Sequence, residues 1–235
     1  MSGKKWGSLA VEALLIVVSI LLAFYIDAAW SARTDRLEEV DLLGDLRGEL
    51  LENRALLEQR IGIHTDFAAT GAEFLSLPQI AGHADSAEAS DLRRIFVARA
   101  TFQPVGGALS RLTQSGDLRL VSDPELRSLL ADWPRRISEN AEEEVRATNL
   151  VDNHLRPFLV RRGVAVAIVD AQPPGWMIDL PDGPPIPLAV VLDEEGRGLI
   201  ALRVSIERLI VRENERLIEV IDRIVSEIDR VLAGI

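Results

Sequence analysis

The residues whose types could do chemistry are few in this sequence and lie far apart. The chain contains three histidines, His64, His83 and His154, and none has a second ligand residue at the i+3 or i+4 spacing of a helical metal site. It contains no cysteine, which excludes thiolate metal sites and disulfide bonds. We therefore expect no metal site.

Two short motifs have part of the pattern of a catalytic or phosphate-binding loop. The serine of "SGDLRL" (115–120) lacks the surroundings of a nucleophile elbow, and we interpret the segment as a helix end and turn. "PVGG" (104–107) lacks the lysine that follows the glycines of a phosphate-binding loop. We predict that the protein is not an enzyme and that it has neither catalytic residues nor a cofactor.

Charge excludes one further class of partner. The chain has 37 acidic and 26 basic residues, and its formal net charge is −11, so we expect no binding to nucleic acid. We interpret the acidic run Glu142-Glu143-Glu144 as a solvated helix face. For the basic pairs Arg135-Arg136 and Arg161-Arg162, solvated surface is the first interpretation, and contact with lipid headgroups or an acidic partner is the alternative. For Trp133 and Trp176, each beside prolines, we expect packing roles.

The segment "SLAVEALLIVVSILLAFYIDAAW" (8–30) predicts a membrane span. Leu9 to Ile26 covers about 27 Å of helix at 1.5 Å per residue, close to the hydrocarbon thickness of about 30 Å. Trp6 and Trp30 bracket the segment as interfacial anchors do. Lys4 and Lys5 precede it without an acidic neighbour, which favours a cytoplasmic N-terminus and an exported remainder.

A cleaved signal peptide is the competing interpretation of this segment, with a site at Ala29-Trp30-Ser31. The apolar run is longer than the core of a usual signal peptide, and helical patterning continues without a break after Trp30. We therefore predict a retained single-pass anchor in a bacterial inner membrane, with the bulk of the chain in the periplasm.

One side of the predicted span combines small and polar residues at helical spacing. Ser19 and Ala23 form a small-xxx-small pair of the kind that lets helices approach closely in lipid. We interpret this side as an association stripe, which predicts a homo-oligomer or contact with another membrane protein. The alternative is a solitary anchor in which the carboxylate of Glu12 reaches the lipid headgroups. The stripe consists of Glu12, Ile16, Ser19, Ala23, Asp27 and Trp30.

Helical spacing continues beyond the span. Apolar residues recur at intervals of three or four, or at their sum, at Leu43, Leu46, Leu50, Leu57 and Ile61, and Asn53 and His64 fall on the same stripe. This pattern predicts a stalk helix to Leu77, bent or broken near Gly62 or Gly71. Shorter helices should follow at 91–100, with Ser90 as N-cap, at 104–114, and from 124 to about 162, with a kink at Pro134 and a disturbance at Pro157.

The last third changes character twice. Residues 173–187 hold six of the eleven prolines, and the flanking segments 164–169 and 186–192 could be short strands or extended chain. Ile206 to Val231 then shows a strong apolar face, which predicts an amphipathic helix. We expect an all-α fold in which a transmembrane helix continues into a long stalk, with a helical bundle or hairpin, in part a coiled coil, as the head. The expected divisions are a cytoplasmic tail (1–8), the transmembrane helix (9–29), the stalk (30–77), a helical middle section (78–163), the Pro-rich insert (164–198) and the C-terminal helix (199–235).

Two segments together resemble a family of bacterial single-span membrane proteins known only as a domain of unknown function. The first runs from Val11 to Asn53, with Glu12, Asp27 and Trp30 at the matching positions, and the second covers residues 102–130. In the second, Phe102-Gln103-Pro104, "SGDL" (115–118) and Asp123 to Arg127 match the family pattern. The resemblance implies a location and a fold, and it implies no activity.

These observations favour a membrane-anchored scaffold or assembly protein that self-associates through its span and stalk. The alternative is a sensor-like periplasmic binding module that acts through a partner membrane protein. The lipid bilayer is the one partner common to both.

Overall fold

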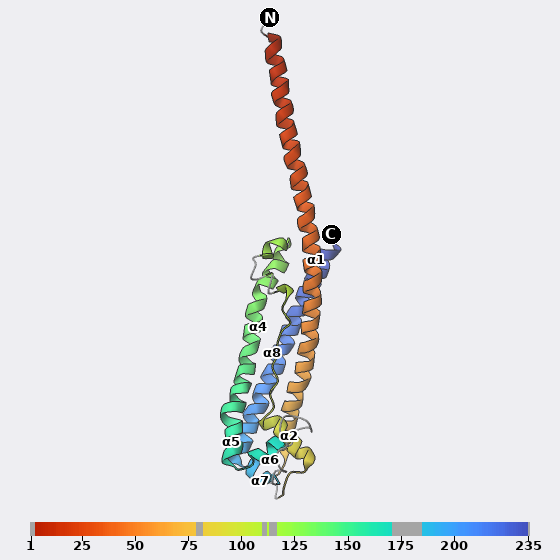
Figure 1. The fold of residues 1–235 in the computed structure, drawn as a ribbon. Helices are drawn as coiled ribbons and strands as arrows, with labels where there is room; N and C mark the ends of the chain where they lie inside the picture. Colours follow the sequence, from red (N-terminus) through yellow and green to blue (C-terminus); the bar gives the residue numbers. More distant parts are fainter. Residues whose placement is uncertain (1–2, 79–81, 110–111, 113–116, 171–184, 235) are drawn as a thin grey trace.

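One helix accounts for the first third of the chain. The computed structural model describes residues 3–78, 82–109, 112, 117–170 and 185–234, and at the N-terminus it describes side chains only from Leu14 onward. Helix α1 runs unbroken from Gly3 to Ser76. Its first half stands alone, and its second half packs into a bundle, as Figure 1 shows. The described residues contain no strand, so the predicted all-α class is confirmed.

Three long helices form the bundle. Residues 39–76 of α1 pack beside α8 (Glu194–Ala233), α8 also packs beside α4 (Pro124–Leu150), and α8 returns toward the point where α1 leaves the bundle (Figure 1). Ion pairs fix the antiparallel register of α1 and α8, with Arg47 Nε 2.7 Å from Asp229 Oδ1 and Arg54 Nε 2.8 Å from Asp222 Oδ1. The stalk stripe predicted from the leucines is therefore buried against the same chain.

The smaller elements close the end of the bundle that is far from the N-terminus. These are α2 (Ser86–Phe96), the π-helical segment η2 (Val151–Leu155), α5 (Arg156–Arg161), α6 (Ala165–Asp170) and α7 (Leu188–Val191) (Figure 1). The short 3-10 helix η1 (Asp117–Leu120) precedes α4 at the other end. Two hydrophobic clusters result: a proximal one around Leu46, Leu126 and Ile224, and a distal one around Phe96, Phe158 and Ile200.

The predicted break in the stalk near Gly62 or Gly71 is wrong. A Cβ atom built on Gly62 would meet nothing within 4 Å, whereas one built on Gly71 would lie 2.5 Å from Val204 Cγ2. Gly71 therefore permits the close approach of α8 rather than a bend. Burial of the α1 face along α8 outweighs the cost of about 1 kcal/mol for each helical glycine.

The helix expected at 91–100 begins earlier. Its N-cap is Asp85 rather than Ser90, and the Asp85 carboxylate accepts from Glu88 N at 2.8 Å in a capping box. The helix expected from 124 to about 162 is present and continues through Pro134. The predicted disturbance at Pro157 takes the form of the π-helical turn η2, in which Arg156 N–H donates to the Val151 carbonyl. A wider turn is favoured there because Pro157 has no N–H to donate.

The strands considered at 164–169 and 186–192 are absent from the described part of the chain. Both segments contain helices, α6 and α7, and only His83 and Pro187 form an isolated bridge. The reason is the spacing of their buried residues, Val164, Ala167 and Ile168 in one and Leu188, Val191 and Leu192 in the other, which is that of a helix. Residues 171–184 of the Pro-rich insert, which include Trp176, lie outside the described residues, as do Ser115 and Gly116.

The C-terminal helix starts at Glu194, five positions before the predicted Leu199. Asp193 caps it through Gly196 N at 2.8 Å. A Cβ at Gly196 would lie 1.9 Å from the Val191 carbonyl oxygen, so only glycine allows this tight entry into α8.

Candidate functional site

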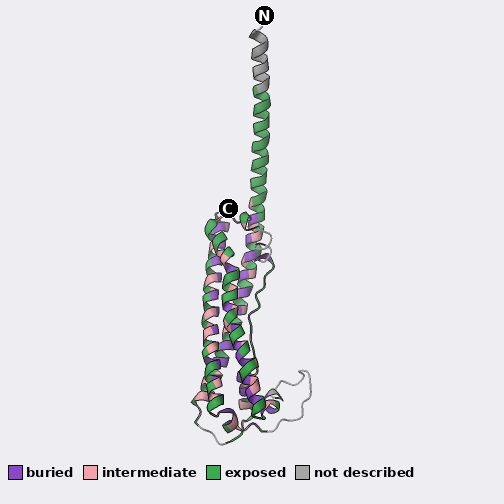
Figure 2. Cartoon of the chain, turned by 90° about the vertical axis from the view of Figure 1, so that its left-hand side faces the viewer, coloured by how far each residue is buried: buried purple, intermediate pink, exposed green. Residues whose placement is uncertain are grey.

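The core of the bundle is interrupted by charged and amide side chains. The buried positions of α1, α4 and α8 repeat at intervals of three and four, as in a coiled coil, and Figure 2 shows the buried faces turned toward one another. In the middle of each helix, polar residues occupy these positions. On α1, for example, His64 lies between Leu57 of the proximal cluster and Ala68 of the distal cluster. The polar layer consists of His64, Asn140, Glu144, Arg203, Glu207 and Asn214, each at most 5% exposed.

Glu207 is the centre of the polar layer. Its side chain is completely buried, and one carboxylate oxygen makes a short hydrogen bond with Nδ1 of His64 on α1. The other oxygen lies 2.5 Å from Nε of Arg203, one turn earlier on α8, in an ion pair whose angle is not that of a hydrogen bond. Removing Arg203 would leave the carboxylate of Glu207 without its ion pair in a medium of low dielectric constant.

Arg203 ties the layer to the chain after α2. One terminal nitrogen donates to the Ala98 carbonyl at 3.0 Å, and the guanidinium lies 5.3 Å from the ring centre of Phe67. Burial lowers the pKa of Arg203, and the neighbouring Glu207 partly opposes this effect. The side chain still holds a full charge at neutral pH, because arginine does not deprotonate in proteins.

Glu144 brings α4 into the same layer. Both of its carboxylate oxygens accept from Phe102 N at 2.9 Å. Burial raises the pKa of Glu144, although the Phe102 hydrogen bond and the charge of His64 act in the opposite direction. The interpretation of Glu142-Glu143-Glu144 as a wholly solvated face is therefore wrong for Glu144. The helical spacing of Leu130, Trp133, Ile137 and Asn140 extends to position 144 and places it inside.

An extended segment, residues 101–106, lies along α1 and α4 (Figure 1). Asn53 of α1 pairs with it as a neighbouring strand would: Nδ2 donates to the Val105 carbonyl at 2.8 Å, and Oδ1 accepts from Val105 N at 2.7 Å. Glu49 accepts from the next amides, Gly107 N at 2.9 Å and Ala108 N at 2.7 Å. The sequence marked Asn53 as a polar residue on an apolar stripe, and this pairing is the reason.

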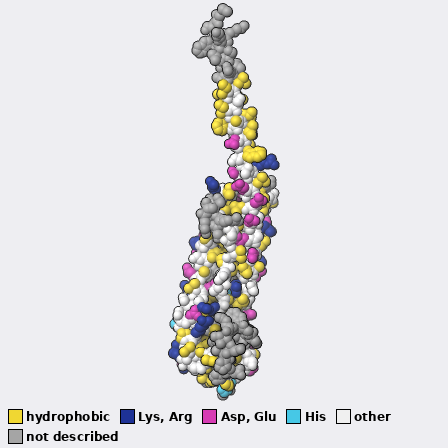
Figure 3. Space-filling model, viewed as in Figure 1, with side chains coloured by type: hydrophobic (Ala, Val, Ile, Leu, Met, Phe, Trp, Pro, Cys, Tyr) yellow, Lys and Arg dark blue, Asp and Glu magenta, His cyan; other side chains and the backbone are white. Residues whose placement is uncertain are grey.

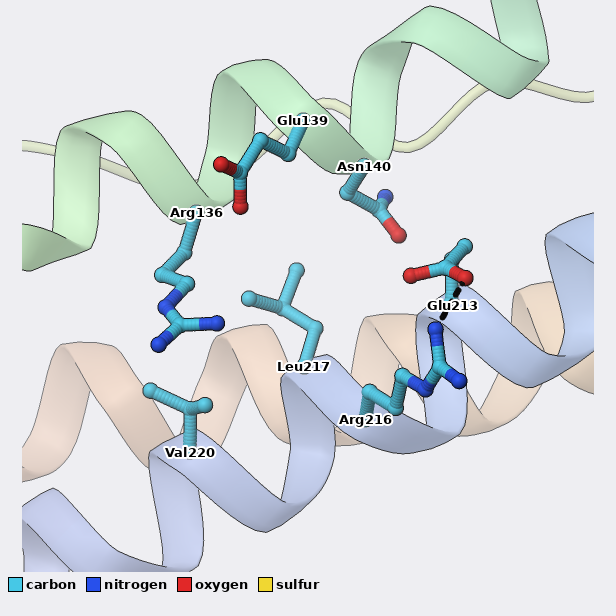
Figure 4. A pocket seen from close by; sticks show the side chains of 7 residues that line it. All are labelled: Arg136, Glu139, Asn140, Glu213, Arg216, Leu217 and Val220. Atoms are coloured by element: carbon cyan, nitrogen blue, oxygen red, sulfur yellow. Dashed lines mark hydrogen bonds and ion pairs between the residues drawn. The ribbon is translucent and has the colours of Figure 1, made fainter.

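Two amides of the polar layer have no hydrogen-bond partner among the described residues. Asn140 is 4% exposed and Asn214 is fully buried. In both residues the side-chain nitrogen and oxygen lack a hydrogen-bond partner within the described part of the chain. Asn140 also lines a cavity of about 300 Å³ between α4 and α8, shown in Figure 4. Both helices contribute charged residues to the rim of this cavity.

The association stripe is exposed along its described length. Ile16 is 56% exposed and Trp30 is 74% exposed, and Asp27 also faces outward. The Ser19 hydroxyl donates to the Leu15 carbonyl of its own helix at 2.8 Å. Ala23 is exposed, and the side chain of Glu12 lies outside the described part. The stripe and the polar layer thus occupy different stretches of the same continuous helix.

The other singled-out residues are mostly on the surface. His83 and His154 are exposed and far from His64 in the chain, and the described residues contain no group that could hold a metal ion. Arg135 and Arg136 pair with Asp132 on their own helix, and Arg161 and Arg162 pair with Glu195. Trp133 is buried in the proximal cluster, as expected for a packing role.

Of the polar layer, sequence reasoning placed only His64 on an apolar stripe. It did not single out Arg203, Glu207 or Asn214 on the last helix. Continuing the spacing of Ile210, Leu217, Ile221 and Ile224 backward would have placed Glu207 and Asn214 on the buried side.

The chemistry available to this layer is hydrogen bonding and charge compensation inside the bundle. Two helices, α1 and α8, and the chain after α2 meet at one carboxylate, Glu207, or at its direct partners. A change of charge or register at this level would act on α1, which continues to the apolar N-terminal segment. No protein-family model, curated protein or solved structure matches the chain.

Proposed function

We propose that the protein is a membrane-anchored helical scaffold that self-associates through its span. The observation that supports this most directly is the difference between the two halves of α1. The bundle half is buried against α8, while the N-terminal half contains an 18-residue apolar window of mean hydropathy 2.1 with no part buried. Figure 3 shows hydrophobic side chains along this half and acidic side chains where it approaches the bundle.

The bundle completes its core within one chain. The stalk stripe, Leu43 to Phe74, is buried within the same chain, chiefly against α8, so we place self-association in the span and not in the stalk. Ser19 and Ala23 offer the small side chains that close helix contact in lipid requires.

The bundle begins a fixed distance beyond the span. Its first buried α1 residue is Glu39, whose carboxylate accepts from Ser122 N at 2.6 Å and from Arg36 at 2.7 Å. Burial alone would raise the pKa of Glu39, but these hydrogen bonds outweigh it and the pKa is lowered. From Trp30 to Glu39 the helix rises about 14 Å. The unbroken helix would therefore hold the head away from the bilayer at a set height.

The same proposal includes the finer location. The basic N-terminus and the resemblance to single-span bacterial membrane proteins support an inner-membrane protein with a cytoplasmic N-terminus and a periplasmic head. The bilayer is then its first partner, and a second copy of the chain or another membrane protein is the next.

The test is the native mass of the full chain extracted in mild detergent. We expect one homo-oligomer, and we expect Ala23→Ile and Glu12→Leu to reduce it toward the monomer. Ala28→Ile is the matched control, because at about 100° per residue position 28 lies about 140° around the helix from position 23. A monomeric wild-type protein, or equal effects of Ala23→Ile and Ala28→Ile, would refute assembly through the stripe.

A specific observation favours the sensor-like alternative as well. The unpartnered amide of Asn140 faces a cavity between two helices of the bundle, next to the layer that joins them to α1. In that function, a ligand held between α4 and α8 would alter the bundle and, through α1, a partner in the membrane. Co-elution of one defined membrane protein with a monomeric chain would favour it over the scaffold.

A further inference from the structure

The cavity between α4 and α8 combines a buried amide, an apolar floor and a charged rim. Its floor contains Leu217, 3% exposed, and the amide of Asn140, 4% exposed. Its rim contains two arginines and two glutamates, and Val220 completes the apolar part. Figure 4 shows these side chains converging on the gap from both helices.

Asn140 is the observation that points to a ligand. Its amide group turns into the gap toward α8 (Figure 4), and neither its nitrogen nor its oxygen has a hydrogen-bond partner among the described residues. A buried amide without a partner is unfavourable, and an apolar side chain would fit this core position better. A bound polar molecule would supply the missing acceptor and donor.

Arg136 places a guanidinium cation at one end of the cavity. Its Nε is engaged with Asp132 Oδ2 at 2.9 Å, and its two terminal nitrogens have no partner within the described ranges. In Figure 4 the guanidinium lies beside Leu217 and Val220, at one end of the cavity. A planar guanidinium with free terminal N–H groups is suited to a carboxylate.

A carboxylate of α8 lies at the other side of the same cavity. Glu213 approaches Asn140 from α8, and one of its oxygens accepts from Arg216 at 2.6 Å. Glu139 belongs to α4 and pairs with Arg135 outside the cavity. With two arginines and two glutamates, the formal charge of the rim is zero. A neutral rim that offers both a guanidinium, Arg136, and a carboxylate, Glu213, favours a zwitterion over a molecule with a net charge.

We propose that this cavity binds a free α-amino acid with a small apolar side chain. Arg136 would bind the carboxylate, Glu213 the ammonium group, and Asn140 would bridge to both, while the ligand side chain would rest on Leu217 and Val220. The volume of about 300 Å³ admits a molecule of this size. This site does not depend on self-association through the span, so either proposal can fail without the other.

The experiment is calorimetric titration of the full chain in lipid nanodiscs with L-valine and L-leucine. We expect saturable binding to the wild type, no binding of isovalerate, which lacks the ammonium group, and none of isobutylamine, which lacks the carboxylate. Arg136→Gln should weaken binding at least tenfold. Arg146→Gln is the matched control, because Arg146 is also exposed on α4 and pairs with Glu143 away from the cavity.

Two further measurements make the outcome decisive. Asn140→Leu should abolish binding while the variant stays folded by circular dichroism, and native mass should be unchanged in every variant. Absence of heat with both amino acids would overturn the proposal and leave Asn140 as a group held by water. Binding of isovalerate as strong as that of L-valine would overturn the assignment of Glu213 to an ammonium group.

Discussion

Replacing Glu207 by glutamine should destabilise the bundle far more than any surface substitution. The side chain is 0% exposed and is the direct partner of both His64 and Arg203. Glutamine keeps the shape but removes the negative charge, which leaves the guanidinium of Arg203, itself 1% exposed, without its ion pair. Breaking a buried pair in this way costs about 3–5 kcal/mol.

The three linked side chains of His64, Arg203 and Glu207 should behave differently when all three are replaced together. The triple variant His64→Leu, Arg203→Met, Glu207→Leu removes all three charges or polar groups together. Apolar replacement of a complete buried network is commonly neutral or stabilising by about 1–4 kcal/mol. We therefore expect the triple variant to be at least as stable as the wild type, although the single variant is not.

The assay is urea unfolding of the full chain in mild detergent, followed by circular dichroism at 222 nm. For a unit of this size, each kcal/mol corresponds to about 2–4 °C in melting temperature, so the Glu207→Gln loss should also appear thermally as about 6–20 °C. Glu58→Gln is the control, since Glu58 also pairs with an arginine, Arg54, but is 53% exposed, and its loss should leave the unfolding midpoint unchanged.

Two results would refute this reasoning. If Glu207→Gln and Glu58→Gln had equal effects, Glu207 would be accessible to water in solution. If the triple variant were as unstable as Glu207→Gln, the polar layer would add net stability, and its persistence in the core would need no functional explanation.

Two further predictions concern the glycines of α1 and the buried carboxyl group of Glu144. Gly62→Ala should stabilise the bundle by about 0.5–1 kcal/mol, because it improves helix propensity in open space. The free energy of unfolding of Gly71→Ala, measured by urea titration, should be about 1–3 kcal/mol lower than that of Gly62→Ala, because the new Cβ would overlap Val204. Equal stabilities of the two variants would contradict the close approach of α8 at Gly71. Burial raises the pKa of Glu144, so the folded state binds the carboxyl proton of Glu144 more tightly than the unfolded state does. Protonation of Glu144 therefore stabilises the fold at acid pH, and this stabilisation is lost as pH rises from about 4.5 through the raised pKa. Glu144→Gln should keep an acceptor for Phe102 N and lack this loss, which urea midpoints between pH 4 and 8 would show; identical pH profiles would place Glu144 in water.

Several elements could be predicted from the sequence because the signal is local. Apolar residues at intervals of three and four predicted the stalk to Leu77 and the last helix, and an uninterrupted apolar run predicted the exposed N-terminal half of α1. Proline in a first turn and an aspartate before it marked the start of α4 at Pro124. Each of these features depends on the few residues that make the element itself.

The errors arose where local preference and packing disagreed. Glycine at position 71 is unfavourable in an isolated helix, but α8 occupies the space that a larger side chain would need. The β-branched residues of 164–169 favour a strand locally, yet burial of Val164 and Ile168 on one side selects a helix.

The sequence alone determined the class of the protein: an apolar N-terminal helix followed by a helical head, because hydrophobic periodicity is a property of each segment taken separately. Only the tertiary structure decided which partners meet. His64 and Glu207 are 143 positions apart, and their contact depends on the register between α1 and α8, which neither segment specifies by itself. The same register, set by the packing of three helices, places Asn140 over the cavity and buries Glu144, so the candidate site exists only once the bundle has formed.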